Sequence, residues 1–121
     1  MPRLKVSLFV EANAKVLEAA KGMAIDAVEI HTGDFARDQL NNSDLKNHLD
    51  LFSKAKAICE QAGWGHHAGH GLTAEGLRFL AGHQLFAEYN IGHWIICRAV
   101  FDGLGPVVHD LRRIIDENCR A

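Results

Sequence analysis

The chain has 121 residues, of which 48% are hydrophobic and 23% charged, and its formal net charge is -2. This length and composition indicate one globular domain over residues 1–121 and exclude a generally disordered chain. The absence of a basic excess argues against a nucleic-acid partner, and no apolar run approaches the ~20 residues that cross a bilayer.

The start of the chain and its cysteines indicate a cytoplasmic protein. The first residues lack the apolar segment of a secretory signal peptide. Cys59, Cys97 and Cys119 are odd in number and widely spaced, and no CxxC pair occurs. This pattern favours free thiols in a reducing compartment over a disulfide framework.

The first elements alternate between strand and helix. Alternating apolar and polar residues predict a strand over 5–10, and helical spacing predicts a helix over 13–22. A second strand is expected over 27–31. Its aliphatic residues face the helices, whereas Glu29 and His31 lie on the opposite face. A carboxylate and an imidazole on that face indicate a barrel interior close to a site.

The rest of the chain continues the alternation. In chain order we expect a polar loop over 32–43, a helix over 44–62, a strand over 64–68, a helix from Thr73, a strand over 88–91, and helices over 93–101 and 106–118. Such an order predicts parallel strands joined by right-handed crossovers.

The helix over 93–101 is strongly apolar. We expect five of its residues to pack inside the protein: Trp94, Ile95, Ile96, Val100 and Phe101. Arg98 in the same helix meets either a phosphate or a neighbouring acid.

Two junctions between a strand and a helix combine histidine with glycine. His70 stands between Gly69 and Gly71, and Gly92 precedes His93 at the start of the next helix. Small residues let backbone N–H groups approach a ligand, and the N-terminal end of a helix favours an anion such as phosphate. Histidine also exchanges protons near neutral pH. The alternative for His70 is a surface turn histidine without a role.

Glu29 and the remaining histidines have weaker signals. Inside a barrel, Glu29 would stabilise developing positive charge or move a proton, although a simple salt bridge is the alternative. His66 and His67 fit packed or hydrogen-bonded strand residues better than catalytic ones. Zinc bound by histidines is a competing interpretation, but His66 and His70 do not lie on one helix, so we assign no metal.

Several short motifs together resemble the pyridoxine 5'-phosphate synthase family. They are residues 6–9 (VSLF), 29–33 (EIHTG), 68–72 (AGHGL), 90–93 (NIGH) and 98–100 (RAV), in the family's order across nearly the whole chain. The part of the family that they resemble is the C-terminal half, strands five to eight of a TIM barrel. The resemblance therefore implies an α/β fold, a (βα)4 half-barrel with an extra short helix before the last helix.

The resemblance also implies a reaction. The family condenses 3-amino-2-oxopropyl phosphate with 1-deoxy-D-xylulose 5-phosphate in vitamin B6 biosynthesis, without an organic cofactor. By matching motifs, His70 corresponds to the proton donor and Glu29 to the carboxylate that stabilises the transition state. Gly71, Gly92 and His93 correspond to contacts with 3-amino-2-oxopropyl phosphate.

Half a barrel has consequences for assembly. The motifs of the family's N-terminal half have no counterpart in this chain, and four strands leave two open sheet edges. We therefore expect a homo-oligomer or a complementing N-terminal half. Two other functions are open: a non-catalytic phosphate-binding half-barrel that needs a partner half, and a fragment of a metal-dependent barrel hydrolase.

Overall fold

The computed structural model describes residues 2–118. Strands and helices follow one another along the chain as β1 (Ser7–Val10), α1 (Ala14–Ala20), β2 (Ala27–His31), α2 (Gly33–Leu40), α3 (Lys46–Ala62), β3 (Gly65–Gly69), α4 (Ala74–His83), β4 (Glu88–Asn90), α5 (His93–Asp102) and α6 (Leu104–Asn118). All four predicted strands are present.

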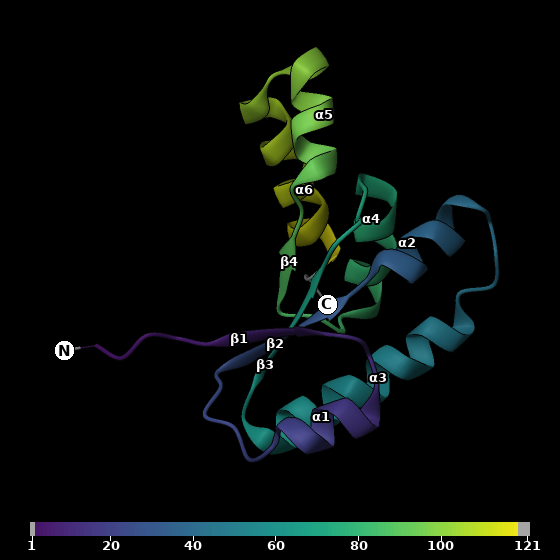
Figure 1. The fold of residues 1–121 in the computed structure, drawn as a ribbon. Helices are drawn as coiled ribbons and strands as arrows, with labels where there is room; N and C mark the ends of the chain where they lie inside the picture. The colour runs from purple at the N-terminus through teal and green to yellow at the C-terminus, as the bar shows by residue number, and fades with distance from the viewer. Residues whose placement is uncertain (1, 119–121) are drawn as a thin grey trace.

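The strands form one parallel sheet in the order β1-β2-β3-β4. Each neighbour in the sheet is the next strand along the chain, as in one half of a TIM barrel. The sheet turns strongly between β1 and β4 but does not close, and Figure 1 shows the two outer strands running in clearly different directions. The predicted α/β half-barrel fold is confirmed.

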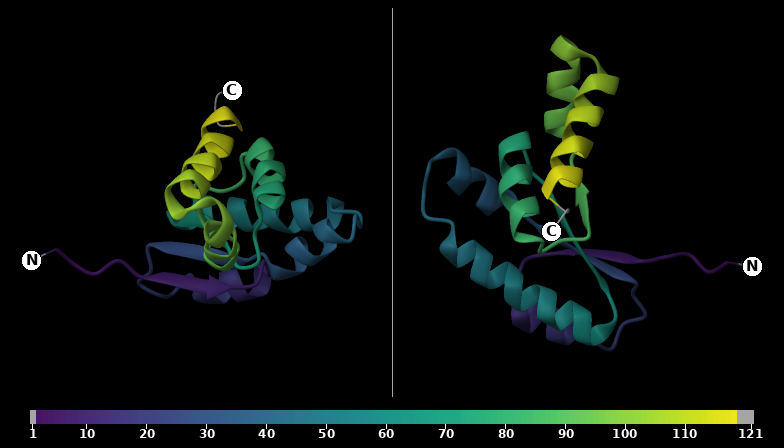
Figure 2. Two further views of the ribbon diagram at one scale, coloured as in Figure 1. Left: turned by 90° about the horizontal axis from the view of Figure 1, so that it is seen from above. Right: turned by 180° about the vertical axis from the view of Figure 1, so that it is seen from behind.

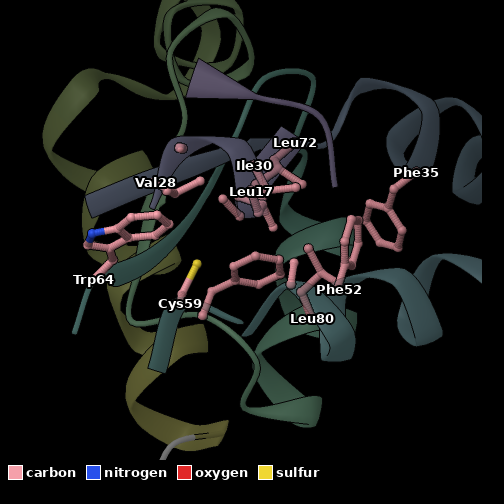
Figure 3. Packing of buried hydrophobic residues seen from close by; sticks show 13 residues of the cluster. Leu17, Val28, Ile30, Phe35, Phe52, Cys59, Trp64, Leu72 and Leu80 are labelled. Carbon is pink, nitrogen blue, oxygen red and sulfur yellow. The ribbon is translucent and has the colours of Figure 1, made fainter. Parts of the chain in front are cut away.

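Helices cover the outer face of the sheet and form the main core with it. Val28 and Ile30 on β2 are fully buried among helical residues such as Leu17, Phe52 and Leu80 (Figure 3). Burial of each large aliphatic side chain stabilises the fold by about 1.5–3 kcal/mol. The two faces of β2 therefore differ as predicted: aliphatic residues point to the helices, and the polar residues lie on the other, partly open face.

Local signals set the ends of several helices. Asn13 caps α1 by accepting backbone N–H groups from Lys15 and Val16. Gly63 ends α3 with a φ of 75°, a left-handed conformation that favours glycine. Thr73 caps α4, because its hydroxyl oxygen accepts the N–H of Gly76 at 3.2 Å.

The prediction of a polar loop over 32–43 was wrong, because residues Gly33–Leu40 form helix α2. Phe35 and Ala36 are buried on one side of this helix, while Asp34 and Arg37 are exposed to solvent. The Phe35 ring lies 5.9 Å from the Phe52 ring and 5.8 Å from the Phe79 ring. Phe52 and Phe79 are distant from Phe35 in sequence. The residues of α2 alone therefore do not reveal the apolar contact that stabilises this helix.

The packing expected for α5 holds for one of its sides only. Trp94 and Ile95 pack partly buried against a cluster around Leu77. Ile96, Val100 and Phe101, however, are 61%, 78% and 81% exposed, so the prediction that they pack inside was wrong. Figure 2 shows the physical reason: α5 and α6 stand side by side beyond the sheet, and the outer side of α5 faces away from the other elements of residues 2–118.

The cysteines that are described carry no disulfide. Cys59 is buried and Cys97 exposed, whereas Cys119 lies outside the described residues. Burial raises the pKa of the Cys59 thiol to about 11, so it is an unreactive core residue at neutral pH.

No helix within residues 2–118 combines the length and apolar character needed to cross a membrane.

Candidate active site

Four of the sequence-predicted site residues line one cavity. His70 and Gly71 follow β3, Gly92 and His93 follow β4, and all four border a space of about 460 Å³. The carboxyl ends of neighbouring parallel strands lie at one edge of a sheet, which brings together residues about twenty positions apart. A cavity of this size suits a small ligand.

His70 has an unusual backbone conformation. Its φ is 79°, in the left-handed region that costs a non-glycine residue about 1–2 kcal/mol. Two other non-glycine residues of the described chain have positive φ, but Gln84 caps the end of α4 and Asn42 follows the end of α2. His70 instead directly follows a strand, so helix termination does not account for its conformation.

The ring of His70 is exposed on one side and stacked on the other. The His31 ring lies parallel to it, with centroids 4.5 Å apart and planes 26° apart. Phe9 follows in the same group, 5.2 Å from His31. Gly33 N–H donates to His31 Nδ1 at 3.2 Å, which orients the His31 ring. His70 is thus an exposed residue that borders the cavity and whose ring is stacked on that of His31.

The N-terminal end of α5 also borders the cavity. Gly92 is its N-cap, no side chain within the described chain caps it, and its first turn holds no acidic residue. Its first backbone N–H groups are therefore available to an anion, and the helix dipole adds partial positive charge there. His93 begins this helix, and its Nε2 lies 3.5 Å from Cys97 Sγ.

Glu29 lies beside this cavity, on the open inner face of the sheet. It lines a larger space of about 630 Å³ together with His67 and Glu88. Its side chain crosses β3 above Gly69, where an added Cβ would overlap the carboxylate. At the far side Asn90 Nδ2 donates to Glu29 Oε2 at 3.1 Å.

Asn90 is a site residue that the sequence analysis did not single out. It lines both the space that holds Glu29 and the cavity of His70, so the two spaces adjoin at its side chain. The available signal was its position: a polar amide at the end of the last strand, directly before the loop that begins α5.

The strand histidines differ in environment. His66 faces the helices, is 5% exposed, stacks on Phe86 at 4.5 Å, and lies with Nδ1 2.9 Å from the carbonyl oxygen of Leu85. Burial lowers the pKa of His66 below its usual value. This confirms the packed, hydrogen-bonded interpretation of His66. His67 faces the inner side, where its Nδ1 lies 3.9 Å from Glu88.

Two open questions about other ligands can be addressed. Within residues 2–118, no group of three or more His, Cys, Asp or Glu side chains has a metal-binding arrangement. Arg98 Nη2 pairs with Asp102 Oδ2 at 2.6 Å, so the neighbouring acid is one partner of its guanidinium.

The arrangement has a definite chemical capability. A helix N-terminus with small residues binds an anionic group, an exposed imidazole transfers a proton, and a nearby carboxylate stabilises positive charge. All three line adjoining spaces at or beside the same sheet edge.

Comparison with known proteins adds an independent finding. The family described as "Pyridoxal phosphate biosynthesis protein PdxJ" matches residues 2–117. Among similar proteins, the "Pyridoxine 5'-phosphate synthase" of Gluconobacter oxydans is 39% identical over 113 residues, covering 93% of this chain and 46% of the relative. The protein of the same name from Ehrlichia chaffeensis is 34% identical over 112 residues, covering 93% and 45%. The chain thus spans about half the length of the curated relatives it matches.

Proposed function

The chain belongs to the family of pyridoxal phosphate biosynthesis protein PdxJ, and from this premise we propose that it supplies part of the active site of a pyridoxine 5'-phosphate synthase. The proposed reaction condenses 3-amino-2-oxopropyl phosphate with 1-deoxy-D-xylulose 5-phosphate, releasing inorganic phosphate and water. The chain would correspond to the C-terminal half of the barrel.

The cavity of His70 is the proposed place of 3-amino-2-oxopropyl phosphate. Its phosphate would lie at the N-terminal end of α5, against the backbone of Gly92 and His93, with Gly71 lining the opposite side. His70 would donate a proton, and the Glu29 carboxylate would stabilise positive charge in the transition state. The proposal requires no organic cofactor and no metal.

One observation carries this proposal. Two glycine-histidine turns, separate in sequence and both matching motifs of the family, border the same cavity of about 460 Å³. A surface turn histidine without a role would not need to meet a second histidine turn and an uncapped helix end.

The open sheet supports a second component of the proposal. Four parallel strands leave unpaired edges at β1 and β4, and the inner face exposes Phe9 to 54%. We propose that another half-barrel completes the site, either a second copy of this chain or a separately made N-terminal half, which would bind the deoxyxylulose phosphate. We place the protein in the cytoplasm, because its free thiols suit a reducing compartment.

The test is formation of pyridoxine 5'-phosphate by this chain, with and without the N-terminal half of the Gluconobacter oxydans relative. We expect product only with the added half. His70→Gln should then lower the rate by about 100-fold or more, whereas His83→Gln on the exposed side of α4 should not.

Two results would contradict the proposal in different ways. Binding of 3-amino-2-oxopropyl phosphate without product in any combination would favour the non-catalytic phosphate-binding half-barrel. The absence of both binding and product would reject the cavity as a phosphate site.

A further inference from the structure

The segment that follows β2 lies directly against His70. This segment, residues 31–33, contributes a different contact from each residue. Its proximity to His70 follows from the register of the sheet, in which His31 pairs with Gly69.

Thr32 holds the backbone of the turn. Its side chain is fully buried, and its Oγ1 lies 2.7 Å from the carbonyl oxygen of Gly69 and 2.9 Å from that of His70. Its backbone N–H also donates to Gly69 O at 2.8 Å. A buried hydroxyl shared by two successive carbonyl groups fixes the peptide planes on both sides of the His70 Cα.

His31 and Gly33 hold the ring. The His31 ring is stacked on that of His70, and its Nδ1 lies 3.2 Å from the backbone N–H of Gly33. Gly33 leaves room for both rings, since a Cβ there would lie 3.1 Å from His70 Cδ2 and closer still to His31 Cε1. The segment therefore restrains both the backbone and the side chain of one residue.

We propose that Thr32 and His31 are positioning residues for His70: Thr32 maintains its left-handed backbone, and His31 fixes the orientation of its ring. The inference rests on the proposed role of His70 as proton donor. A histidine in the left-handed backbone conformation is disfavoured unless surrounding contacts hold it there. A proton donor that is displaced from its place also loses catalytic efficiency.

The direct test is NMR of the histidine ring protons in this chain, with the His70 signals assigned from His70→Gln. Stacking on His31 should shift the His70 signals, and both Thr32→Val and His31→Leu should move them toward the position of a free histidine. Thr32→Ser, which keeps the hydroxyl, should restore the wild-type position.

A control separates positioning from stability. Gly63→Ala should destabilise the left-handed end of α3, at the opposite end of β3, and lower Tm without moving the His70 signals. The proposal is wrong if the His70 signals stay in place in Thr32→Val and His31→Leu, or if Thr32→Ser fails to restore them.

Turnover gives a second reading when the complementing half is supplied. Thr32→Val should lower kcat by on the order of 10- to 100-fold with little change in KM, and Thr32→Ser should recover it. If the wild-type protein shows no turnover, the proposed function fails, while the NMR result still decides whether Thr32 and His31 position His70.

Discussion

At the scale of single residues, Gly69 has a role that its neighbours in sequence do not reveal. It stands beside His70, but its lack of a Cβ makes room for the side chain of Glu29 on the adjacent strand. The carboxylate passes over Gly69 to reach the amide of Asn90. Gly69 on β3 thus allows Glu29 on β2 to reach Asn90 on β4.

We predict that Gly69→Ala displaces the Glu29 carboxylate and breaks its hydrogen bond with Asn90. The three heavy atoms nearest to the added methyl group all belong to the flexible side chain of Glu29, so the fold should persist with Tm little changed. The measurement is the NMR shift of the Asn90 side-chain amide. Gly22→Ala, where an added Cβ meets nothing within 4 Å, is the matched control. An unchanged Asn90 signal in Gly69→Ala would contradict the geometry.

A second residue-scale prediction concerns His66 and pH. Because burial lowers the pKa of His66, the unfolded chain binds more protons than the folded one once pH falls below about 6.5. The stabilising effect of neutral His66 is thus complete above this pH and is lost as pH falls toward the folded-state pKa. Its slope is at most about 1.4 kcal/mol per pH unit.

The measurement for His66 is the free energy of unfolding between pH 7 and pH 5. His66→Phe keeps a ring against Phe86 and removes the titrating group, so its pH dependence should be weaker than that of the wild type. His83→Phe, at an exposed position, should keep the wild-type slope. Equal slopes in all three proteins would show that His66 is not the group responsible.

At the scale of elements, two successive helices begin differently. Thr73 caps α4 with its hydroxyl, whereas α5 begins at Gly92 without a side-chain cap. A cap stabilises a helix by about 1 kcal/mol, so the uncapped start of α5 is a loss of stability. It is explained if a bound anion takes the place of the cap.

We predict that Gly92→Asp stabilises the protein and removes its affinity for inorganic phosphate. An Asp side chain has room there and complements the helix dipole, giving about 0.3–1 kcal/mol. The same carboxylate repels phosphate and should weaken binding at least about tenfold. Thermal unfolding and calorimetric titration measure the two effects.

Gly92→Ala is the control for this prediction. The position has free space and its φ of -118° suits any residue, so Ala should leave phosphate binding close to wild type. Strong phosphate binding by Gly92→Asp would mean that the start of α5 is not the anion site.

At the scale of the whole molecule, two of the places where residues 2–118 expose apolar side chains bear on assembly. One is the β1 edge of the open sheet, with Val6 and Phe9 exposed to 42% and 54%. The other is the outer side of α5 with Phe101. Closing the barrel would cover the β1 edge, with its unpaired backbone groups, but not the outer side of α5.

We predict that the chain associates through its open sheet at micromolar concentration, as measured by size exclusion with light scattering. The double variant Val6→Lys/Phe9→Lys should shift the chain toward the monomer, because charged residues at a sheet edge oppose pairing. Phe101→Lys should not. A well-folded wild-type monomer would contradict the prediction, and a monomer produced by Phe101→Lys would assign the interface to α5.

The sequence by itself determined the features that depend on neighbouring residues. Alternation predicted β1 and β2 and the two faces of β2, and the expected end of a helix at residue 62 and start of the next at Thr73 agree with the structure. The family motifs, which are also short and local, agree with the match over residues 2–117. These signals act over one or two turns of chain, where spacing alone decides which side a residue faces.

Only the tertiary structure decided how distant segments meet. It made α2 a helix by bringing Phe35 to Phe52, left the outer side of α5 uncovered, and placed Asn90 against Glu29 across Gly69. Each outcome depends on strand register and on which elements pack together. Residues far apart in sequence set both, so no single segment contains the information.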